Sequence, residues 1–558
     1  MRSKSTTEPT SNPHLAMDTI HFPPRLLASA GLAGVLVQLL ISRTREVPTM
    51  PFLTLYGLGE IAVVSLLHHL LGAHVSVVSA AVQMNVVFLT VLVSLTVVRR
   101  MFFHPLCCFP GPRMAAASGW YAAYLSSEGR LGHELRALHN ELGDIVRMGP
   151  NEVSCIDVNA LGPLYSKSLS HNSRGPFYEI SGLIGETSLV TERGSKKHAV
   201  LKRIWDPAFK PAAIREYEPI IEKHVAVLAE VLEGKADKEV NVVEFVSHMG
   251  FDIMAELGFG KHFGMQDGTG NPAYVNFMHK FMRFTSFCGA LPHLCNFIRF
   301  MPKSPAVRAF QKLVEDMLTE RLAKGSGKSK DVMEYLLEPD EDTGKLLSPG
   351  EMFANVVLLI VAGAEPTSNV LSCMFLELAR NPEIQAKLYA EVSAHARNVD
   401  QLNVQNTKGL KYLQAVIDET LRLWPPGIRG IQALVGPDGM SAAGSFIPPY
   451  TAVRIPSLAT QTDDRYFPQG KKFIPERWTE RPELVRDRRA LFAFSCGEHA
   501  CLGKNLGLAE IRLTAAKMVE QFELRLGESW DEKKFLGDWK DYYTVSLGKI
   551  SLKFRPRR

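Results

Sequence analysis

The ten residues FSCGEHACLG, at positions 494–503, are the most informative part of this sequence. Apolar residues then recur at the spacing of one helix face, at Leu502, Leu506, Ala509, Leu513 and Ala516. Cys501 is therefore predicted at a helix N-terminus, where the helix dipole and free backbone N–H groups favour a thiolate. Gly497 and Gly503 would let the backbone approach a flat ligand closely. From these residues alone, a buried structural cysteine and a reactive or metal-binding thiolate both remain open.

The chain around this stretch, from residue 114 to 558, is dominated by helical patterns. Apolar residues recur every three or four positions in five segments, namely His198–Phe209, Ile214–Leu232, Pro305–Leu322, Ser348–Arg380 and Pro382–Arg397. Strand-like runs are few and short, namely Ile145–Val153, Ala452–Ile455 and Tyr543–Leu547. The sequence predicts a mainly α body with a small β part.

The first hundred residues follow another pattern. Residues 1–25 are polar and Pro-containing, and are predicted to form a disordered tail. Three apolar runs follow, Leu26–Ser42, Phe52–Ala73 and Val75–Val98, and the third is uncharged and long enough to cross a hydrocarbon core of about 30 Å. Glu60 weakens the second run, because an acid at mid-span costs about 2.5–3.5 kcal/mol. Residues 26–100 therefore predict a membrane anchor of one to three transmembrane helices.

The third apolar run ends at Arg99 and Arg100, and basic residues at the end of a span favour the cytosolic side. Residues 101–113 then contain Pro105, Pro110 and Pro112, which cannot continue a helix. This segment is predicted to be a stiff elbow between the anchor and a cytosolic body at 114–558.

Charge and cysteine content exclude two classes of protein. The chain has 63 Lys+Arg against 58 Asp+Glu, a net charge of +5, which is too balanced to suggest a nucleic-acid partner. Eight Cys in 558 residues do not make a disulfide scaffold.

The 494–503 stretch resembles the haem-binding loop of the cytochromes P450, whose pattern is Phe-x-x-Gly-x-Arg-x-Cys-x-Gly. Four of the five fixed positions match: Phe494, Gly497, Cys501 and Gly503. The resemblance implies haem b as cofactor and Cys501 as the axial ligand of its iron, with a thiolate that favours O–O cleavage. His499 stands where the family has an Arg that binds a haem propionate. A His can donate too, but it is shorter and only partly charged at pH 7.

Two further motifs occur in the family's order. Glu419 and Arg422 lie in Glu-Thr-Leu-Arg, and Arg477 lies in Pro-Glu-Arg-Trp. The resemblance implies that these three residues form a buried, structural network near the proximal side of the haem. Without the resemblance, the better interpretation of Glu419 and Arg422 is an exposed pair of little energetic value.

The segment from His198 to Trp205 resembles the family helix that contacts the haem propionates. The resemblance makes His198 and Arg203 candidates for cofactor binding, with Trp205 and Arg429 as further candidates. An amphipathic surface helix is an equally good interpretation of the same residues.

The stretch AGAEPTS at 362–368 resembles the oxygen-binding groove of the family, Ala/Gly-Gly-x-Asp/Glu-Thr-Thr/Ser. The resemblance implies that Glu365 and an alcohol relay protons into this groove. Pro366 replaces the first Thr, so Thr367 or an ordered water is expected to supply the hydroxyl. Pro366 also lacks an N–H group, so the helix is expected to kink where the carbonyl of Ala362 loses its partner.

The resemblance covers residues 103–558 and implies a cytochrome P450 fold preceded by transmembrane helices in the endoplasmic reticulum membrane. It implies a haem-thiolate monooxygenase that oxidises a hydrophobic small molecule, with electrons from NADPH through NADPH-cytochrome P450 reductase. The elbow and residues 503–510 resemble fungal membrane-bound members. The multi-span N-terminus and residues 174–178 resemble fungal members that oxidise terpenoids or prenylated indole alkaloids, which suggests such a substrate. Two alternatives remain open: a haem-thiolate isomerase or dehydratase, motivated by Pro366, and a non-enzymatic haem-binding membrane protein, motivated by His499.

Overall fold

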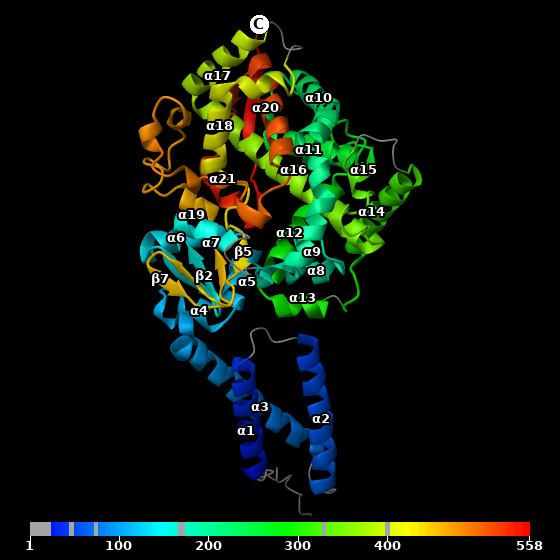
Figure 1. The fold of residues 1–558 in the computed structure, drawn as a ribbon, viewed down its shortest axis with the longest axis vertical. Helices are drawn as coiled ribbons and strands as arrows, with labels where there is room; N and C mark the ends of the chain where they lie inside the picture. Colours follow the sequence, from blue (N-terminus) through cyan, green and yellow to red (C-terminus); the bar gives the residue numbers. More distant parts are fainter. Residues whose placement is uncertain are drawn as a thin grey trace, which may run out of the picture. The chain divides into compact units, whose positions relative to one another are not determined.

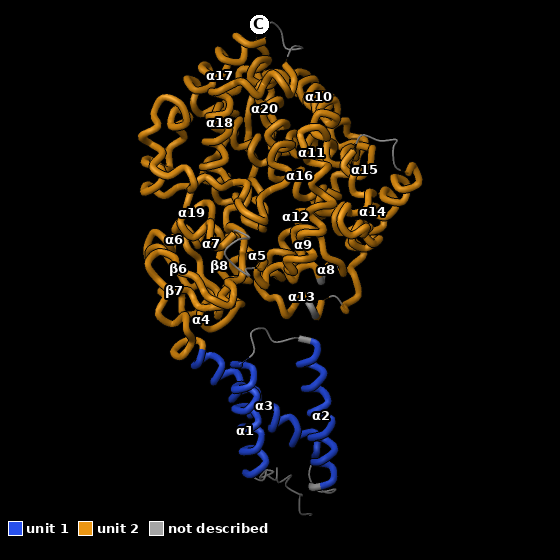
Figure 2. Tube along the Cα trace, viewed as in Figure 1, with its two compact units in different colours: residues 1–99 blue, residues 100–558 orange. Residues whose placement is uncertain are grey.

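The computed structural model describes residues 24–43, 49–71, 76–165, 173–298, 300–325, 331–396 and 402–557. The predicted disordered tail, residues 1–25, lies outside this part of the chain except for its last two residues. The chain divides into two compact units, Met1–Arg99 and Arg100–Arg558 (Figure 2).

The described part of the first unit consists of three helices, α1 (Pro24–Arg43), α2 (Thr49–Leu71) and α3 (Val77–Val98). All three are long and apolar enough to cross a membrane. The buried face of α1 carries Ala30, Gly34 and Gln38. A side chain at Gly34 would place its Cβ 2.9 Å from the carbonyl oxygen of Phe88 in α3. The small residues of α1 therefore permit close packing of these two helices.

Glu60, the acid that weakens the second apolar run, has a partner in the structure. The Nδ2 atom of Asn85 in α3 donates to Oε2 of Glu60 at 2.7 Å, and the hydroxyl of Tyr56 donates to Oδ1 of Asn85. Hydrogen bonding between helices is the usual way in which an apolar bundle retains a polar side chain. The cluster therefore accounts for an acid in the middle of α2.

The predicted elbow begins later than the sequence suggested. A π-helical turn, Arg99–Phe103, continues the helical path past residue 100, because the first proline of the segment stands only at position 105. A 3-10 turn, Pro105–Cys108, follows and is capped by His104, and the next helix, α4 (Arg113–Ala117), begins after Pro112.

The second unit is mainly helical, as predicted (Figure 1). After α4, its helices are α5 (Trp120–Ser127), α6 (Leu131–Leu142), α7 (Leu161–Tyr165), α8 (Ser181–Ile184), α9 (Ser195–Trp205), α10 (Pro211–Glu233), α11 (Val242–Phe259), α12 (Ala273–Gly289), α13 (Pro292–Ile298), α14 (Pro305–Ala323), α15 (Val332–Leu336), α16 (Pro349–Arg380), α17 (Pro382–His395), α18 (Lys411–Leu423), α19 (Ser457–Gln461), α20 (Lys504–Gln521) and α21 (Glu532–Asp538). The five predicted helical segments correspond to α9, α10, α14, α16 and α17. Helix α9 ends before Pro207, and a 3-10 turn completes the segment that was predicted as one helix.

Helix α16 runs through the middle of the second unit, with α11 and α20 packed against it (Figure 1). It begins with a capping box, in which Ser348 Oγ accepts from the N–H of Glu351 and the Glu351 carboxylate accepts from the N–H of Ser348. The helix continues unbroken across Pro366, so any bend at this residue does not interrupt it. Although α16 is apolar enough to cross a membrane, most of it is buried inside the unit and forms its core.

The β part is divided among small sheets. One sheet has the order β1-β2-β8-β5-β3, in which β2 and β8 are parallel and the other pairs antiparallel. Its strands are β1 (Ile145–Gly149), β2 (Glu152–Cys155), β3 (Ser173–Arg174), β5 (Gln432–Leu434) and β8 (Ala452–Arg454). The others are formed by β4 (Glu239–Asn241), β12 (Ser551–Pro556) and β9 (Phe522–Leu526), by β6 (Met440–Ala442) and β7 (Ser445–Ile447), and by β10 (Lys540–Tyr542) and β11 (Thr544–Ser546).

The single strand predicted over Ile145–Val153 is wrong. The segment forms the hairpin β1–β2, with a turn at Pro150 and Asn151. Proline cannot donate to a strand ladder and favours turns, which explains the break.

Candidate active site

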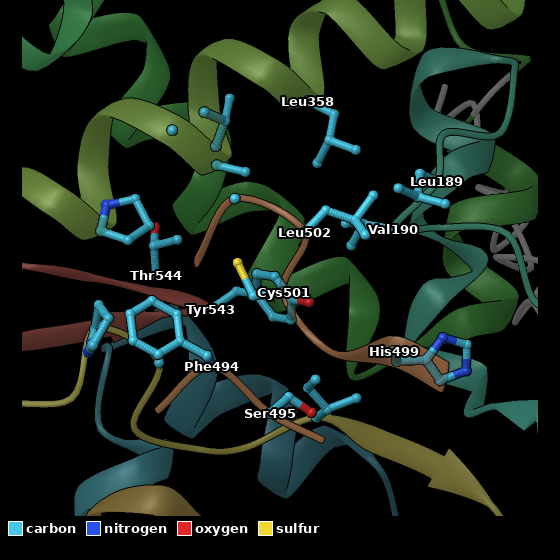
Figure 3. Close-up of a pocket in the computed structure, with 18 of the residues that line it drawn as sticks. Leu189, Val190, Leu358, Phe494, Ser495, His499, Cys501, Leu502, Tyr543 and Thr544 are labelled. Carbon is cyan, nitrogen blue, oxygen red and sulfur yellow. The ribbon is translucent and has the colours of Figure 1, made fainter. Parts of the chain in front are cut away.

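A cavity of about 450 Å³ lies in the second unit and contains Cys501 in its wall. The wall is built from α9, α11, α12 and α16, from the 492–503 segment and the start of α20, and from the turn between β10 and β11. Most of its side chains are apolar, among them Met254, Phe281, Leu358, Val361 and Leu502. The labelled side chains of Phe494, His499 and Cys501 come from one loop, whereas Tyr543 and Thr544 come from the β10–β11 hairpin (Figure 3).

The loop that carries Cys501 is folded back on itself before α20. The N–H of Cys501 donates to the carbonyl oxygen of Phe494 at 2.8 Å, and Gly503 forms the N-cap of α20. Two residues of the loop have positive φ angles, Ser495 at 56° and Gly497 at 70°. Only Gly adopts this region without strain, which explains the glycine at position 497.

The environment of the Cys501 thiol differs from the sequence-based expectation of a favoured thiolate. Solvent reaches the side chain through the cavity, but burial raises the pKa of the thiol, and the N–H groups of Gly503 and Lys504 offset this only in part. The N–H groups at the start of α20 therefore do not lower the pKa of the thiol enough to outweigh burial. A bound metal ion would do so, because a coordinating thiol is deprotonated.

His499, which replaces the expected Arg, lies beside His198. Its Nδ1 atom is 3.2 Å from Nε2 of His198, and His198 is buried with its Nδ1 atom 3.6 Å from a carboxylate oxygen of Glu498. Burial, together with the nearby charges of Arg174, His198 and Lys202, lowers the pKa of His499 to about 2. His499 is therefore neutral at pH 7.

Of the two cofactor-binding candidates on α9, the structure brings only His198 to the cavity. Nε and Nη2 of Arg203 donate to the two carboxylate oxygens of Asp340 at 2.9 Å each, and Arg203 does not line the cavity. Lys202 lines it instead, as do Trp205 and Arg429. Residues four apart share a helix face, so the spacing from His198 favours Lys202 over Arg203.

Two buried guanidinium groups in the cavity wall have unused hydrogen-bonding capacity. Within the described residues, Nε of Arg174 and Nη1 of Arg429 are buried without a hydrogen-bond partner. Leaving such groups unsatisfied costs free energy, more so when they are charged. Arg429 is already paired with Asp541, but Arg174 makes no ion pair among the described residues. Together with Lys202, these residues fit a flat, apolar ligand that carries carboxylates at one edge, as haem does.

The predicted proton-relay residues are not joined to each other. The Glu365 carboxylate accepts a hydrogen bond from the hydroxyl of Thr544 at 2.5 Å and lies 3.4 Å from Nε2 of His279. Thr367 lines the cavity, and its hydroxyl oxygen lies close to α20, 3.5 Å from where a Cβ on Gly507 would stand. Glu365 and Thr367 share no hydrogen bond in the described part of the chain, so the structure pairs the acid with a threonine that the sequence did not indicate.

The geometry of the Glu419 group matches the predicted network. Nε and Nη2 of Arg422 donate to the two carboxylate oxygens of Glu419 at 2.9 and 2.8 Å, and Nε of Arg477 donates to Glu419 Oε1 at 2.9 Å. All three residues are at most 1% exposed. Arg422 also donates to the backbone carbonyls of Gln461, Gly470 and Lys472. The network thus links α18 to the segment that leads to the Cys501 loop.

Glu510, on α20, is a cavity residue that the sequence did not indicate. It is 1% exposed, and in the described part of the chain neither of its carboxylate oxygens has a hydrogen-bond partner. Burial raises the pKa of this carboxyl to about 8. Glu510 stands among the apolar residues of the α20 pattern, and that pattern did not predict a buried acid.

Comparisons with known proteins agree on one family. The sequence pattern of the Cytochrome P450 family matches residues 112–550. The chain is 32% identical over 463 residues to Cytochrome P450 monooxygenase FCK2 of Fusarium pseudograminearum, which covers 82% of this chain and 83% of that protein. It is 30% identical to the Fusicoccadiene 8-ol C-16 hydroxylase of Alternaria brassicicola, covering 84% of this chain and 97% of that protein.

The fold gives the same result. The crystal structure of the cytochrome P450DA heme domain superimposes with a TM-score of 0.68 at 20% sequence identity, covering 81% of this chain and 98% of that domain. The predicted family and fold class are confirmed. The chain therefore belongs to the cytochrome P450 family and is a monooxygenase that uses haem b.

Proposed function

We propose that this monooxygenase hydroxylates or otherwise oxidises a terpenoid or prenylated indole-alkaloid intermediate of fungal secondary metabolism. The observation that carries the proposal is the largely apolar cavity around Cys501, which suits a hydrophobic substrate with few polar groups. The relative from Alternaria brassicicola is named as a hydroxylase of fusicoccadiene 8-ol, a terpenoid alcohol, and this supports the terpenoid class.

Cys501 is assigned as the residue that would hold the haem iron through its thiolate, and haem, when bound, supplies the iron at which O₂ is reduced. Gly497 and Gly503 keep the loop backbone free of side chains, and Phe494 packs beside the loop, with Lys504 Nζ 5.6 Å from its ring centre. The carboxylates of the cofactor would be held by side chains with donors in the cavity wall: Arg174, His198, Lys202, Arg429 and His499. Here His499 acts as a neutral donor.

Glu365 is assigned to proton delivery, and the Glu419–Arg422–Arg477 network to the framework. Burial raises the pKa of Glu365, with His279 opposing the rise, so the carboxyl carries a proton at higher pH than an exposed acid. The network residues do not line the cavity, and their role is to fix the chain before the Cys501 loop.

Monooxygenases of this family generally need a redox partner, which we take to be NADPH-cytochrome P450 reductase. The anchor at residues 26–100 would hold the protein in the endoplasmic reticulum membrane, with the elbow at 101–113 and the catalytic domain at 114–558 on the cytosolic side. The three apolar helices α1, α2 and α3 support membrane anchoring, and Arg99 and Arg100 after α3 support this orientation.

The test uses the full chain expressed with NADPH-cytochrome P450 reductase in yeast microsomes. Fusicoccadiene 8-ol should yield a product with one more oxygen atom, labelled by ¹⁸O₂ and formed only with NADPH. Conversion of a prenylated indole instead would indicate a prenylated indole-alkaloid substrate. Conversion of neither compound would reject both substrate classes. Turnover that proceeds without NADPH would favour the isomerase or dehydratase alternative.

A spectrum tests the ligand assignment separately from the substrate. The reduced protein should show the red-shifted Soret band with carbon monoxide that marks a haem-thiolate, and Cys501→Ala should abolish it. Cys496→Ala is the matched control, since Cys496 lies in the same loop but does not line the cavity. Loss of the band in Cys496→Ala and not in Cys501→Ala would contradict the assignment.

A further inference from the structure

We propose that Thr544 supplies the hydroxyl of the proton relay, and that His279, Glu365 and Thr544 together form a path for protons into the cavity. This inference rests on the proposed function of the cavity. It assigns the hydroxyl role to a residue on β11, outside the groove sequence of α16.

The inner end of the path opens into the cavity. Thr544 lines the same cavity as Cys501, whereas Glu365 does not line it (Figure 3). The hydroxyl of Thr544 is 2.5 Å from Oε2 of Glu365, a short hydrogen bond. Thr544 is therefore the group through which this buried acid reaches the cavity.

The outer end of the path reaches solvent. Nε2 of His279, on α12, is 3.4 Å from Oε1 of Glu365, the oxygen that Thr544 does not use. The side chain of His279 is 43% exposed, against 8% for Glu365. The acid thus stands between a solvent-accessible imidazole and a hydroxyl in the cavity wall, with one carboxylate oxygen facing each.

The position of Thr544 is fixed by contacts other than its own hydroxyl. Asn369, one helical turn after Glu365 on α16, donates from Nδ2 to the backbone carbonyl of Val545 at 2.5 Å. The hairpin turn at Tyr543 has a φ angle of 82°, unusual for a non-glycine residue, and its N–H donates to Asp541 at 3.2 Å. Strained backbone of this kind persists only where the surroundings hold it, and it concentrates at functional sites.

The groove sequence itself offers no better hydroxyl. Pro366 occupies the position of the family's first Thr and has neither a hydroxyl nor an N–H group. Within the described residues, the hydroxyl of Thr367 forms no hydrogen bond with Glu365, whereas that of Thr544 does. A hydroxyl from β11 therefore replaces the one that α16 lacks.

The proton balance shows what the path must deliver. Monooxygenation converts RH, O₂, two electrons and two protons into ROH and H₂O, so two protons must enter the cavity in each cycle. In each transfer, His279 gives a proton from Nε2 to Oε1 of Glu365. The Thr544 hydroxyl turns its own proton away from Oε2 of Glu365. The carboxyl then gives a proton from Oε2 to Oγ of Thr544, as the original hydroxyl proton moves into the cavity. Solvent reprotonates His279.

A measurement that needs no substrate tests the path. Without substrate, the holoenzyme and its reductase oxidise NADPH and reduce O₂ either to H₂O₂, with two electrons and two protons, or to two H₂O, with four of each. Slower proton delivery favours release of H₂O₂. We expect Thr544→Val to raise the yield of H₂O₂ per NADPH several-fold, Glu365→Gln to do the same, and His279→Gln to raise it less.

Two variants separate the hydroxyl from the fold of the hairpin. Thr544→Ser keeps the hydroxyl and should restore the wild-type yield of H₂O₂. Ser546→Ala removes a hydroxyl from the same strand, two residues further on and outside the cavity wall, and should match wild type. An unchanged yield in Thr544→Val, or a several-fold rise in Thr367→Val alone, would overturn the proposal.

An infrared measurement on the full chain gives a readout that does not depend on turnover. The carboxyl stretch of protonated Glu365 is the band that Glu365→Gln removes. Thr544→Val should shift this band to higher frequency, because the carboxyl loses its hydrogen bond, while Ser546→Ala leaves it in place. A band that does not move would overturn the proposal even if the protein bound no haem, whereas a missing haem-thiolate spectrum would count against the proposed function alone.

Discussion

Two buried acids of the catalytic unit, Glu419 and Glu365, differ in how fully their surroundings pair them. Glu419 is completely buried and accepts hydrogen bonds from two guanidinium groups, the Trp478 indole and the N–H of Ile474. Glu365 accepts from one hydroxyl and faces one half-exposed imidazole. Complete pairing fixes the chain segments that carry the partners, whereas an acid with few partners suits the proton transfer that we propose for Glu365. The completeness of pairing therefore separates a structural acid from a proton-handling one.

The largest effect is expected from breaking the complete pairing. Glu419→Gln leaves Arg422 and Arg477 buried without their counter-charge, which should lower the free energy of unfolding by about 3–5 kcal/mol. Chemical denaturation of the full chain in detergent measures this loss. Glu480→Gln is the matched control, because Glu480 pairs with Lys387 at 2.6 Å but is 61% exposed, and such pairs contribute about 0–1 kcal/mol. Equal losses in the two variants would contradict the distinction.

Glu510, which has no hydrogen-bond partner among the described residues, should make the stability of the protein depend on pH. Burial raises the pKa of Glu510 to about 8 from an ordinary value near 4.5, so the folded state binds more protons than the unfolded state between these values. Stability should therefore fall by a few kcal/mol as pH rises from about 5 to 8. Glu510→Gln should remove this part of the slope and be the more stable protein at pH 8. Parallel pH profiles for the two proteins would show that Glu510 is ionised in the fold.

The same comparison applies to the cations near the cofactor. Arg174 lines the cavity, and its Nε has no hydrogen-bond partner in the described part of the chain, whereas Arg203 is paired with Asp340 outside the cavity. Arg174→Met should weaken haem retention by about 1.5–3 kcal/mol, the usual contribution of a hydrogen bond to a charged group. Arg203→Met should leave it unchanged. Transfer of haem to apomyoglobin measures retention. A larger loss of retention in Arg203→Met than in Arg174→Met would indicate that the propionates lie against Arg203.

The two arginine partners of Glu419 could be predicted from the sequence, and the reason is where these partners stand. Glu419, Arg422 and Arg477 all stand in family motifs, so the resemblance named all three residues before any geometry was known. The long helices were also predictable, since α10, α14, α16 and α17 each carry an apolar stripe over many turns. Short elements were harder to predict, since the segment Ile145–Val153 was predicted as one strand but turns at Pro150.

The partner of Glu365 could not be predicted from the same information. Thr544 lies 179 residues from Glu365 and belongs to a two-stranded hairpin that has no motif. Only the packing of β11 on α16 brings the two together. The prediction of Arg203 as a cavity residue could have been corrected from the sequence, because Lys202 stands four residues after His198 and shares its helix face. Sequence thus sufficed where partners share a motif or a helix, and failed where a tertiary contact supplied the partner.

The smallest effect is expected at His499, where the chain departs from the family. Burial lowers the pKa of His499 to about 2, so its imidazole reaches the cofactor as a neutral donor. Charge-assisted hydrogen bonds are roughly twice as strong as neutral ones, so His499→Arg should improve haem retention by about 1 kcal/mol. The gain should be the same at pH 6 and pH 8, since neither residue titrates there. Retention that rises in wild type as pH falls to 6 would show instead that His499 is protonated, and that His198 and Glu498 stabilise its charge.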